Sequence, residues 1–202
     1  MEQHPKFTTH GKRKSPPTQI VVHITAGPYN KPVPKIVAQH NAAKIKLGYH
    51  TMFSWSTSGE VTKWECADPA TDIVQHARGV NAHTVGVAMV WPGPSDKYWS
   101  ADANALRVGY QRIHGRQQRW LEIPFGLAHA CVQYVYKLAQ DLDISTACPP
   151  ETWDTVLPPD MLAKYGVVGH YHLQRNRTDP GSDWMRVYRD YVALNEQAET
   201  RD

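Results

Sequence analysis

Two histidines of this sequence lie where an imidazole needs a hydrogen-bond partner or a metal ion, because each is part of an apolar run. His23 lies inside "QIVVHITAG", residues 19–27, and His170 ends the run at 166–170. Asp179 follows on a polar segment, directly before Pro-Gly. Two imidazoles and a carboxylate could form the open tetrahedral site of a catalytic zinc ion, with water in the fourth position. A lone buried histidine more often makes a structural hydrogen bond, and these patterns alone leave both interpretations open.

The elements that must position these groups alternate along the chain. Apolar β-branched runs predict strands, and a further pair of alternating segments about Ser58-Gly59 predicts a hairpin. These strands and the hairpin cover 19–27, 49–65, 84–91 and 166–170. Apolar residues at helical spacing predict helices at 33–47 and 125–142, and from about 183 with Asp183 as N-cap. The very polar segment 101–120 is a further helix candidate. The alternation predicts an α/β fold in which a central mixed β-sheet is flanked by α-helices.

Length and charge set the domain organisation. The 202 residues fit a single domain, which we expect over 19–195, with a C-terminal tail at 196–202. Residues 1–18 hold four basic side chains and one acidic one, which accounts for the whole net charge of +3. We therefore expect a flexible, solvated, basic N-terminal arm and a neutral domain, which argues against a nucleic-acid-binding protein.

Composition narrows the class of protein further. No apolar run approaches the roughly 20 residues that a membrane span needs, so no membrane insertion is expected. The three cysteines have no CxxC pair, which predicts reduced thiols rather than a disulfide framework. The N-terminus lacks an apolar stretch after its charges, which predicts synthesis in the cytoplasm without a signal peptide.

Four segments, in order, resemble the zinc-dependent N-acetylmuramoyl-L-alanine amidases. This family includes phage endolysins, wall-recycling amidases and peptidoglycan recognition proteins. "IVVHITAG" is similar to the family's first zinc-ligand strand, and "GYHTMF…SGEV" to its Gly-Tyr-His hairpin. "HARGVNAHTVGVAMV" and "VVGHYHLQRNRTDPG" resemble the later segments, the second of which closes the metal site. The resemblance spans about residues 20–184 and is closest to the phage enzymes.

The resemblance implies that His23, His170 and Asp179 hold one zinc ion per chain. His172 is a rival for His170 within "GHYH", and His170 is preferred because it directly follows Gly169, as the family's ligand does. We expect His172 to lie beside the site or to support a ligand.

Two further positions match catalytic residues of the family. Tyr49 falls on a tyrosine that holds the attacking water or steadies the oxyanion, although a hairpin tyrosine could also simply pack. Arg177 stands where many members have a lysine that stabilises the tetrahedral intermediate, and a guanidinium can do so only electrostatically. Ala88 stands where some wall-recycling members have a catalytic glutamate, which favours the phage-type arrangement.

Substrate contacts are the least determined feature. His76 and Asn81 match the segment that lines the family's groove, but Asn81 could equally hold a loop through its side-chain amide. Trp91 and Trp99 could stack on sugar, although burial is the commoner fate of a tryptophan. Residues 92–124 match no family segment.

The resemblance implies hydrolysis of the amide between the lactyl group of N-acetylmuramic acid and L-alanine in peptidoglycan. We expect a monomeric endolysin that acts on the cell wall after release from the cytoplasm. A secreted antibacterial effector or a recycling enzyme would share these features. A recognition module that binds peptidoglycan without cutting it is the alternative from another class.

Overall fold

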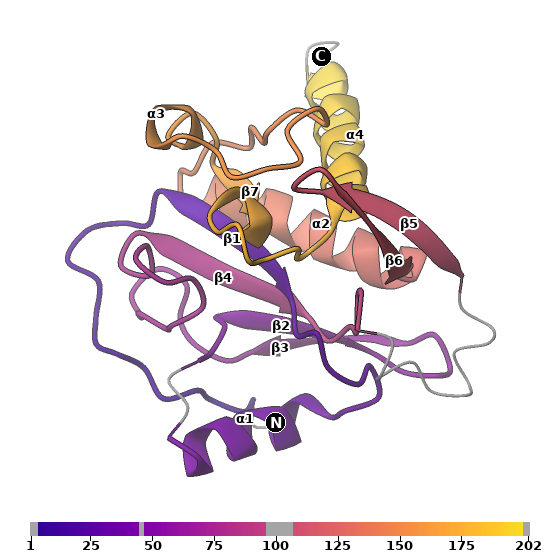
Figure 1. The fold of residues 1–202 in the computed structure, drawn as a ribbon. Helices are drawn as coiled ribbons and strands as arrows, with labels where there is room; N and C mark the ends of the chain where they lie inside the picture. Colours follow the sequence, from indigo (N-terminus) through magenta and orange to yellow (C-terminus); the bar gives the residue numbers. More distant parts are fainter. Residues whose placement is uncertain (1–3, 45–46, 96–106, 200–202) are drawn as a thin grey trace.

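The computed structural model describes residues 4–44, 47–95 and 107–199 and forms one α/β domain around a five-stranded mixed sheet (Figure 1). The strands are β1 (Gln19–Ile24), β2 (Thr51–Trp55), β3 (Val61–Glu65), β4 (Thr84–Met89) and β7 (Val167–Gly169). Their order across the sheet is β3-β2-β4-β1-β7. β1 pairs in parallel with both β4 and β7, and only β3 runs antiparallel to its neighbour. The predicted central mixed sheet is confirmed.

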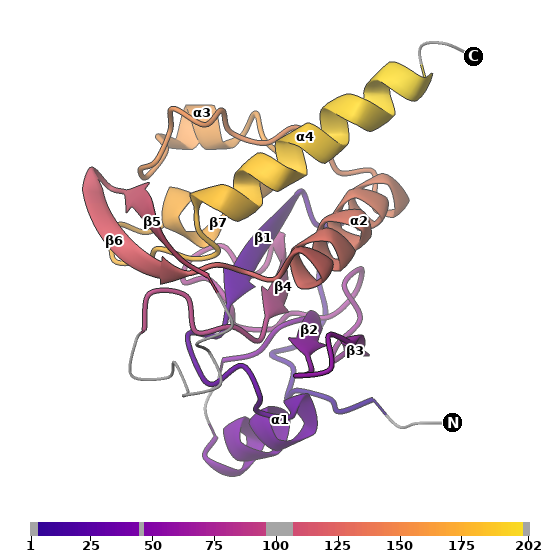
Figure 2. The same ribbon diagram turned by 90° about the vertical axis from the view of Figure 1, so that its right-hand side faces the viewer.

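Helices cover both faces of this sheet (Figure 2). They are α1 (Val33–Ala42), α2 (Phe125–Asp141), the short α3 (Pro159–Leu162) and α4 (Ser182–Glu199). Alternate residues of β1 and β4, such as Ile20, Val22 and Val87, pack against α2 and α4 in the larger apolar core. The opposite face of the sheet packs on α1 through Val33, Ile36 and Val37. His23 belongs to this second face, because side chains alternate along a strand.

The fully buried strands and the apolar helix were predicted with small errors at their ends. The helix predicted at 33–47 ends at Ala42, and the strand predicted at 166–170 ends at Gly169, where a 3₁₀ helix (η3, His170–His172) begins. α4 continues to Glu199, past the boundary expected at 195. Among the described residues, no helix is both long and apolar enough to cross a membrane.

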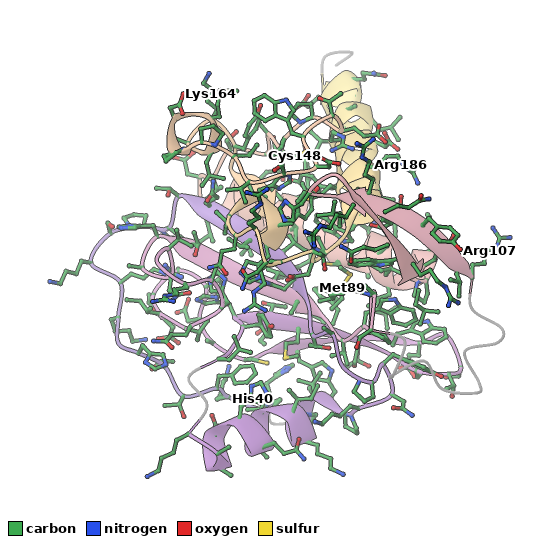
Figure 3. The ribbon with its side chains drawn as sticks, in the orientation of Figure 1. His40, Met89, Arg107, Cys148, Lys164 and Arg186 are labelled. Atoms are coloured by element: carbon green, nitrogen blue, oxygen red, sulfur yellow. The ribbon has the colours of Figure 1, made fainter. Side chains whose placement is uncertain are left out.

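The helix predicted at 101–120 is wrong for its described part. Residues 107–121 instead contain the antiparallel hairpin of β5 (Val108–Ile113) and β6 (Arg116–Leu121), while 101–106 lie outside the described residues. His114 and Gly115 link the two strands with φ angles of 53° and 72°, the left-handed pair that a two-residue hairpin turn requires. Arg107, directly before β5, and Arg186, in α4, are both exposed. Their side chains lie on the outside of the molecule, away from α1 (Figure 3).

The expected solvated arm is a second correction. Phe7 is buried in the apolar cluster with α1, and its backbone N–H donates to the carbonyl of Cys66. Further along, Lys12 forms an isolated β-bridge with Asp72. The described part of the arm is therefore packed along the domain, because its apolar and hydrogen-bonding groups find partners there.

Candidate metal centre

The three predicted ligand residues meet at one point, although they come from segments far apart in the sequence. β1 places His23 in the sheet interior, and η3 places His170 directly after β7, which is the neighbour of β1. Nδ1 of His23 lies 3.0 Å from Oδ2 of Asp179, and Nδ1 of His170 lies 3.2 Å from the same oxygen. One ligand atom from each residue lies within 4.8 Å of the other two. The parallel pairing of β1 and β7 is what brings the histidines together.

The donor set fits a zinc ion. Two imidazole nitrogens and a carboxylate oxygen are zinc ligands, and three protein ligands leave a fourth position open. Ligands bound tetrahedrally at 2.0–2.1 Å lie roughly 3.3 Å from one another. The two separations of 3.0 and 3.2 Å are close to that spacing. The fit rests on the chemistry and spacing of these three donor groups.

Burial sets the charge state of the centre. Burial lowers the pKa of His23 from 6.5 to about 4, so this imidazole is neutral at pH 7. Burial alone would raise the pKa of Asp179, but the imidazoles of His170 and His23 that face its carboxylate outweigh this effect and hold the pKa below its usual value. Neutral imidazoles and an ionised carboxylate are the forms that bind a metal ion.

His172 has both ring nitrogens engaged away from the centre. Its Nδ1 accepts a hydrogen bond from the backbone N–H of Gly169 at 3.0 Å, and its Nε2 donates to the carbonyl of Trp153 at 3.1 Å. It therefore ties the start of η3 to the loop at Trp153. Of the two histidines in "GHYH", His170 is the one that faces Asp179.

Tyr49 and Arg177 both lie near the centre. The ring of Tyr49 is buried, with its centroid 5.2 Å from that of His23. Burial raises the pKa of Tyr49, and the negative charge of Asp179 adds to the rise, so the hydroxyl keeps its proton. Arg177 is exposed, and its backbone carbonyl accepts a 2.8 Å hydrogen bond from Nε2 of His114, on the turn between β5 and β6.

A cavity of about 530 Å³ adjoins the centre and is lined in part by His76, Asn81, His170, Gln174 and Arg177. None of the described residues that line it is acidic. A larger cavity, about 580 Å³, lies between β5, β6 and the starts of α2 and α4, and none of the three candidate ligands lines it. The 530 Å³ cavity is therefore the candidate substrate cleft.

The two predicted groove residues are engaged within the protein. His76 is 3% exposed, and its Nδ1 lies 3.1 Å from Nε2 of His23. Oδ1 of Asn81 accepts hydrogen bonds from the backbone N–H groups of His76 and Ala77, at 2.9 and 2.8 Å. This is the loop-holding alternative for Asn81, and substrate contact by either residue stays a prediction.

The remaining residues to consider are Trp91 and Trp99, predicted as possible sugar contacts, and three residues near His76 and β4. Trp91 is fully buried and donates from Nε1 to the carbonyl of Leu121, so it is not available to stack on sugar; Trp99 lies outside the described residues. Our sequence analysis missed Thr84, whose hydroxyl oxygen lies 3.0 Å from Nε2 of His76. It also missed His50 and Arg13, which form hydrogen bonds with the backbone of β4 at Gly86 and Thr84. Thr84 and Gly86 are two residues apart and therefore lie on the same face of their strand. This spacing, directly after "HARGVN", was the sequence signal that could have indicated that Thr84 lies near His76.

Comparisons with known proteins give a weak likeness in fold. No family model and no curated protein sequence matches the chain. The E. coli N-acetylmuramyl-L-alanine amidase AmiD, solved with anhydro-N-acetylmuramic acid-L-Ala-D-γ-Glu-L-Lys, superposes with a TM-score of 0.48 and 14% identity, over 82% of this chain and 52% of AmiD. The Ph2119 endolysin of a Thermus scotoductus bacteriophage gives 0.49 and 18%, over 84% and 80% of the two chains. PlyL gives 0.46 and 12%, over 84% and 81%. This chain thus spans about half the length of AmiD, and scores this low carry no argument about activity.

Proposed function

We propose that this protein is a zinc-dependent N-acetylmuramoyl-L-alanine amidase that cleaves the lactyl amide bond of peptidoglycan. The observation that carries the proposal is the convergence of His23, His170 and Asp179, three zinc-type ligands with an open side, next to a cleft. The identity of the bond that is cleaved is inferred from the resemblance of the four sequence segments to the amidase family.

The ligand set favours a catalytic ion over a structural one. Structural zinc is normally closed by a fourth protein ligand, whereas a catalytic ion keeps a position open for water or substrate. Among the described residues, these three form the only grouped set of candidate metal ligands. When bound, zinc would supply Lewis acidity that polarises the amide carbonyl and activates water.

The side chains of the cleft would supply the remaining catalysis. The guanidinium of Arg177 is always charged and faces the cleft that His170 also lines, so it would stabilise negative charge on the amide oxygen. The protonated Tyr49 hydroxyl, beside His23, would donate a hydrogen bond to the same oxygen or to water.

The lining of the cleft favours amide cleavage over glycoside cleavage. Glycosidases generally use two carboxyl groups on either side of the bond that is cut. The described lining of the 530 Å³ cavity offers none, and Asp179 is committed to the two histidines. We expect a monomer that acts on the cell wall as a phage-type endolysin.

The decisive experiment incubates the zinc-loaded protein with purified peptidoglycan. We expect new L-alanine amino termini without new sugar reducing ends, and we expect chelation to stop their release and added zinc to restore it. Reducing ends would indicate a glycosidase. Chelator-sensitive binding with no bond cleaved across several wall types would instead favour a recognition module.

A further inference from the structure

We propose that His76 is a positioning residue: it accepts a hydrogen bond from Nε2–H of His23 and so leaves Nδ1 of His23 free to bind the metal. The inference rests on the proposed metal centre but not on the identity of the substrate. It assigns His76 a role behind the centre rather than in the substrate groove.

The surroundings of Thr84 determine which ring nitrogen of His76 carries the proton. The Thr84 hydroxyl lies 3.0 Å from the carbonyl oxygen of Val80, which can only accept, so the hydroxyl proton points there. Nε2 of His76 lies 3.0 Å from the same hydroxyl oxygen and 3.3 Å from the carbonyl oxygen of Thr84. Both neighbours are then acceptors, so Nε2 of His76 carries the proton.

The proton on Nε2 makes Nδ1 of His76 an acceptor, because a neutral imidazole has one donor and one acceptor. The ring is buried and none of its hydrogen-bond partners is an acid, so it is neutral at pH 7. Its Nδ1 lies 3.1 Å from Nε2 of His23, which must therefore donate. The lone pair of His23 is then on Nδ1, the atom that faces Asp179.

The fold holds the ring of His76 in this orientation from two sides. Asn81 fixes the backbone by accepting from the N–H groups of His76 and Ala77. Gly86 leaves the space that the ring needs, because a Cβ at that position would lie 2.5 Å from Cγ of His76. Metal-binding histidines generally donate their second N–H to a fixed partner, and loss of that partner costs 10-fold to 100-fold in metal affinity.

The first test measures zinc affinity by competition with a chromophoric chelator. We expect His76→Leu, which removes the acceptor, to weaken zinc binding about 10-fold to 100-fold. His76→Asn should remain within a few-fold of the wild type, because Oδ1 can take the place of Nδ1. Thr84→Val should give an intermediate loss, since the Thr84 carbonyl remains within 3.3 Å of Nε2.

His50→Asn is the matched control. His50 is also buried, and its ring centroid is 5.9 Å from that of His76, but its Nδ1 accepts from the backbone N–H of Gly86 and makes no hydrogen bond to a ligand. This variant should keep wild-type zinc affinity. Wild-type affinity in His76→Leu, or an equal loss in His50→Asn, would overturn the proposal.

The second test uses the wild-type protein and so does not depend on the folding of a variant. Nitrogen-15 NMR of the zinc-loaded protein at neutral pH should show His76 protonated at Nε2 and His23 protonated at Nε2. A proton on Nδ1 of His76 would overturn the proposal. If the wild type binds zinc but leaves peptidoglycan intact, the amidase function fails while the positioning role stands; if it binds no zinc, both fail.

Discussion

His23 and His170 face the same carboxylate oxygen from two differently built parts of the molecule. We call β1, β4 and the side chains of Tyr49, His50 and His76 the sheet side. We call residues 170–179 the loop side. On the sheet side, His23 has a partner at each ring nitrogen, Asp179 at 3.0 Å and His76 at 3.1 Å. On the loop side, His170 reaches Asp179 through Nδ1, and its Nε2 has no hydrogen-bond partner among the described residues.

The difference shows that the two sides contribute differently to the metal centre. The position of His23 is set by a fully buried strand and a hydrogen-bonded neighbour, before any metal is bound. The loop side supplies the only carboxylate of the ligand set and the exposed guanidinium. Substitutions on the loop side should therefore alter metal binding and turnover, whereas loss of a buried ring on the sheet side should reduce the stability of the metal-free protein.

The largest effect is expected for Asp179→Ala. Loss of the carboxylate removes the charge that both imidazoles face, so zinc affinity should fall by more than the roughly 100-fold that the loss of a supporting residue can cause. Peptidoglycan cleavage should be abolished with it. The metal content of the purified variant checks this, and retention of a full equivalent of zinc with reduced stability would mean that Asp179 only packs against its turn.

Tyr49→Phe and Arg177→Ala compare one catalytic candidate from each side. Each removes one donor to the developing oxyanion, which is worth about 100-fold to 1000-fold in kcat. Zinc content and unfolding temperature should stay close to wild type, as steady-state kinetics and metal analysis would show. Full activity in both variants would contradict the oxyanion roles.

Acid should begin to destabilise the sheet side near pH 6.5, above the range in which carboxylates titrate. Burial lowers the pKa of His50 from 6.5 to about 4. The unfolded chain therefore binds this proton first, and stability falls as the pH drops from about 6.5 to about 4, by roughly 3 kcal/mol for a shift of this size. Urea unfolding in chelator at pH 7 and pH 4.5 measures the loss. His23, whose pKa burial lowers to the same value, adds to the loss, so His50→Asn should reduce the slope without removing it. An unchanged slope would mean that His50 does not titrate in this way.

In metal-free protein, His23→Ala should cost more stability than His170→Ala. His23→Ala leaves a cavity in a buried strand and an unsatisfied Nδ1 on His76, a loss of about 2 kcal/mol or more. His170→Ala removes a side chain whose Nε2 makes no hydrogen bond to a described residue. Urea unfolding in excess chelator compares the two, and equal losses would remove the distinction between the sides.

The strands that carry the sheet side could be predicted because local pattern and tertiary structure agree there. "QIVVHI" and "TVGVAM" are buried on both faces, so a continuous apolar run was sufficient evidence. The His170–Asp179 pair followed from the motif, but no local pattern shows that β7 lies beside β1. That adjacency is a property of the whole sheet.

The hairpin of β5 and β6 could not be predicted from its polar composition. Arginine and glutamine favour helices by intrinsic propensity, but cross-strand pairing and the His114-Gly115 turn determine the structure here. In β5 the alternate residues Gln111 and Ile113 are buried, whereas in β6 the adjacent residues Trp120 and Leu121 are buried. The two strands therefore carry only a short period-two signal, in β5.

The smallest expected effect on stability concerns two neighbours in the basic arm, Arg13 and Lys14. Arg13 donates hydrogen bonds to the backbone carbonyls of Asn81, Ala82 and Thr84, at 3.1, 2.8 and 2.5 Å, which ties the arm to the segment that leads from His76 into β4. Lys14 carries the same charge but is exposed. Arg13→Ala should therefore lower the free energy of unfolding by about 1 to 1.5 kcal/mol. Lys14→Ala should leave it unchanged, as an exposed lysine contributes little. Urea unfolding of both variants measures the difference, and equal, negligible losses would mean that the arm is the solvated tail that its composition predicts.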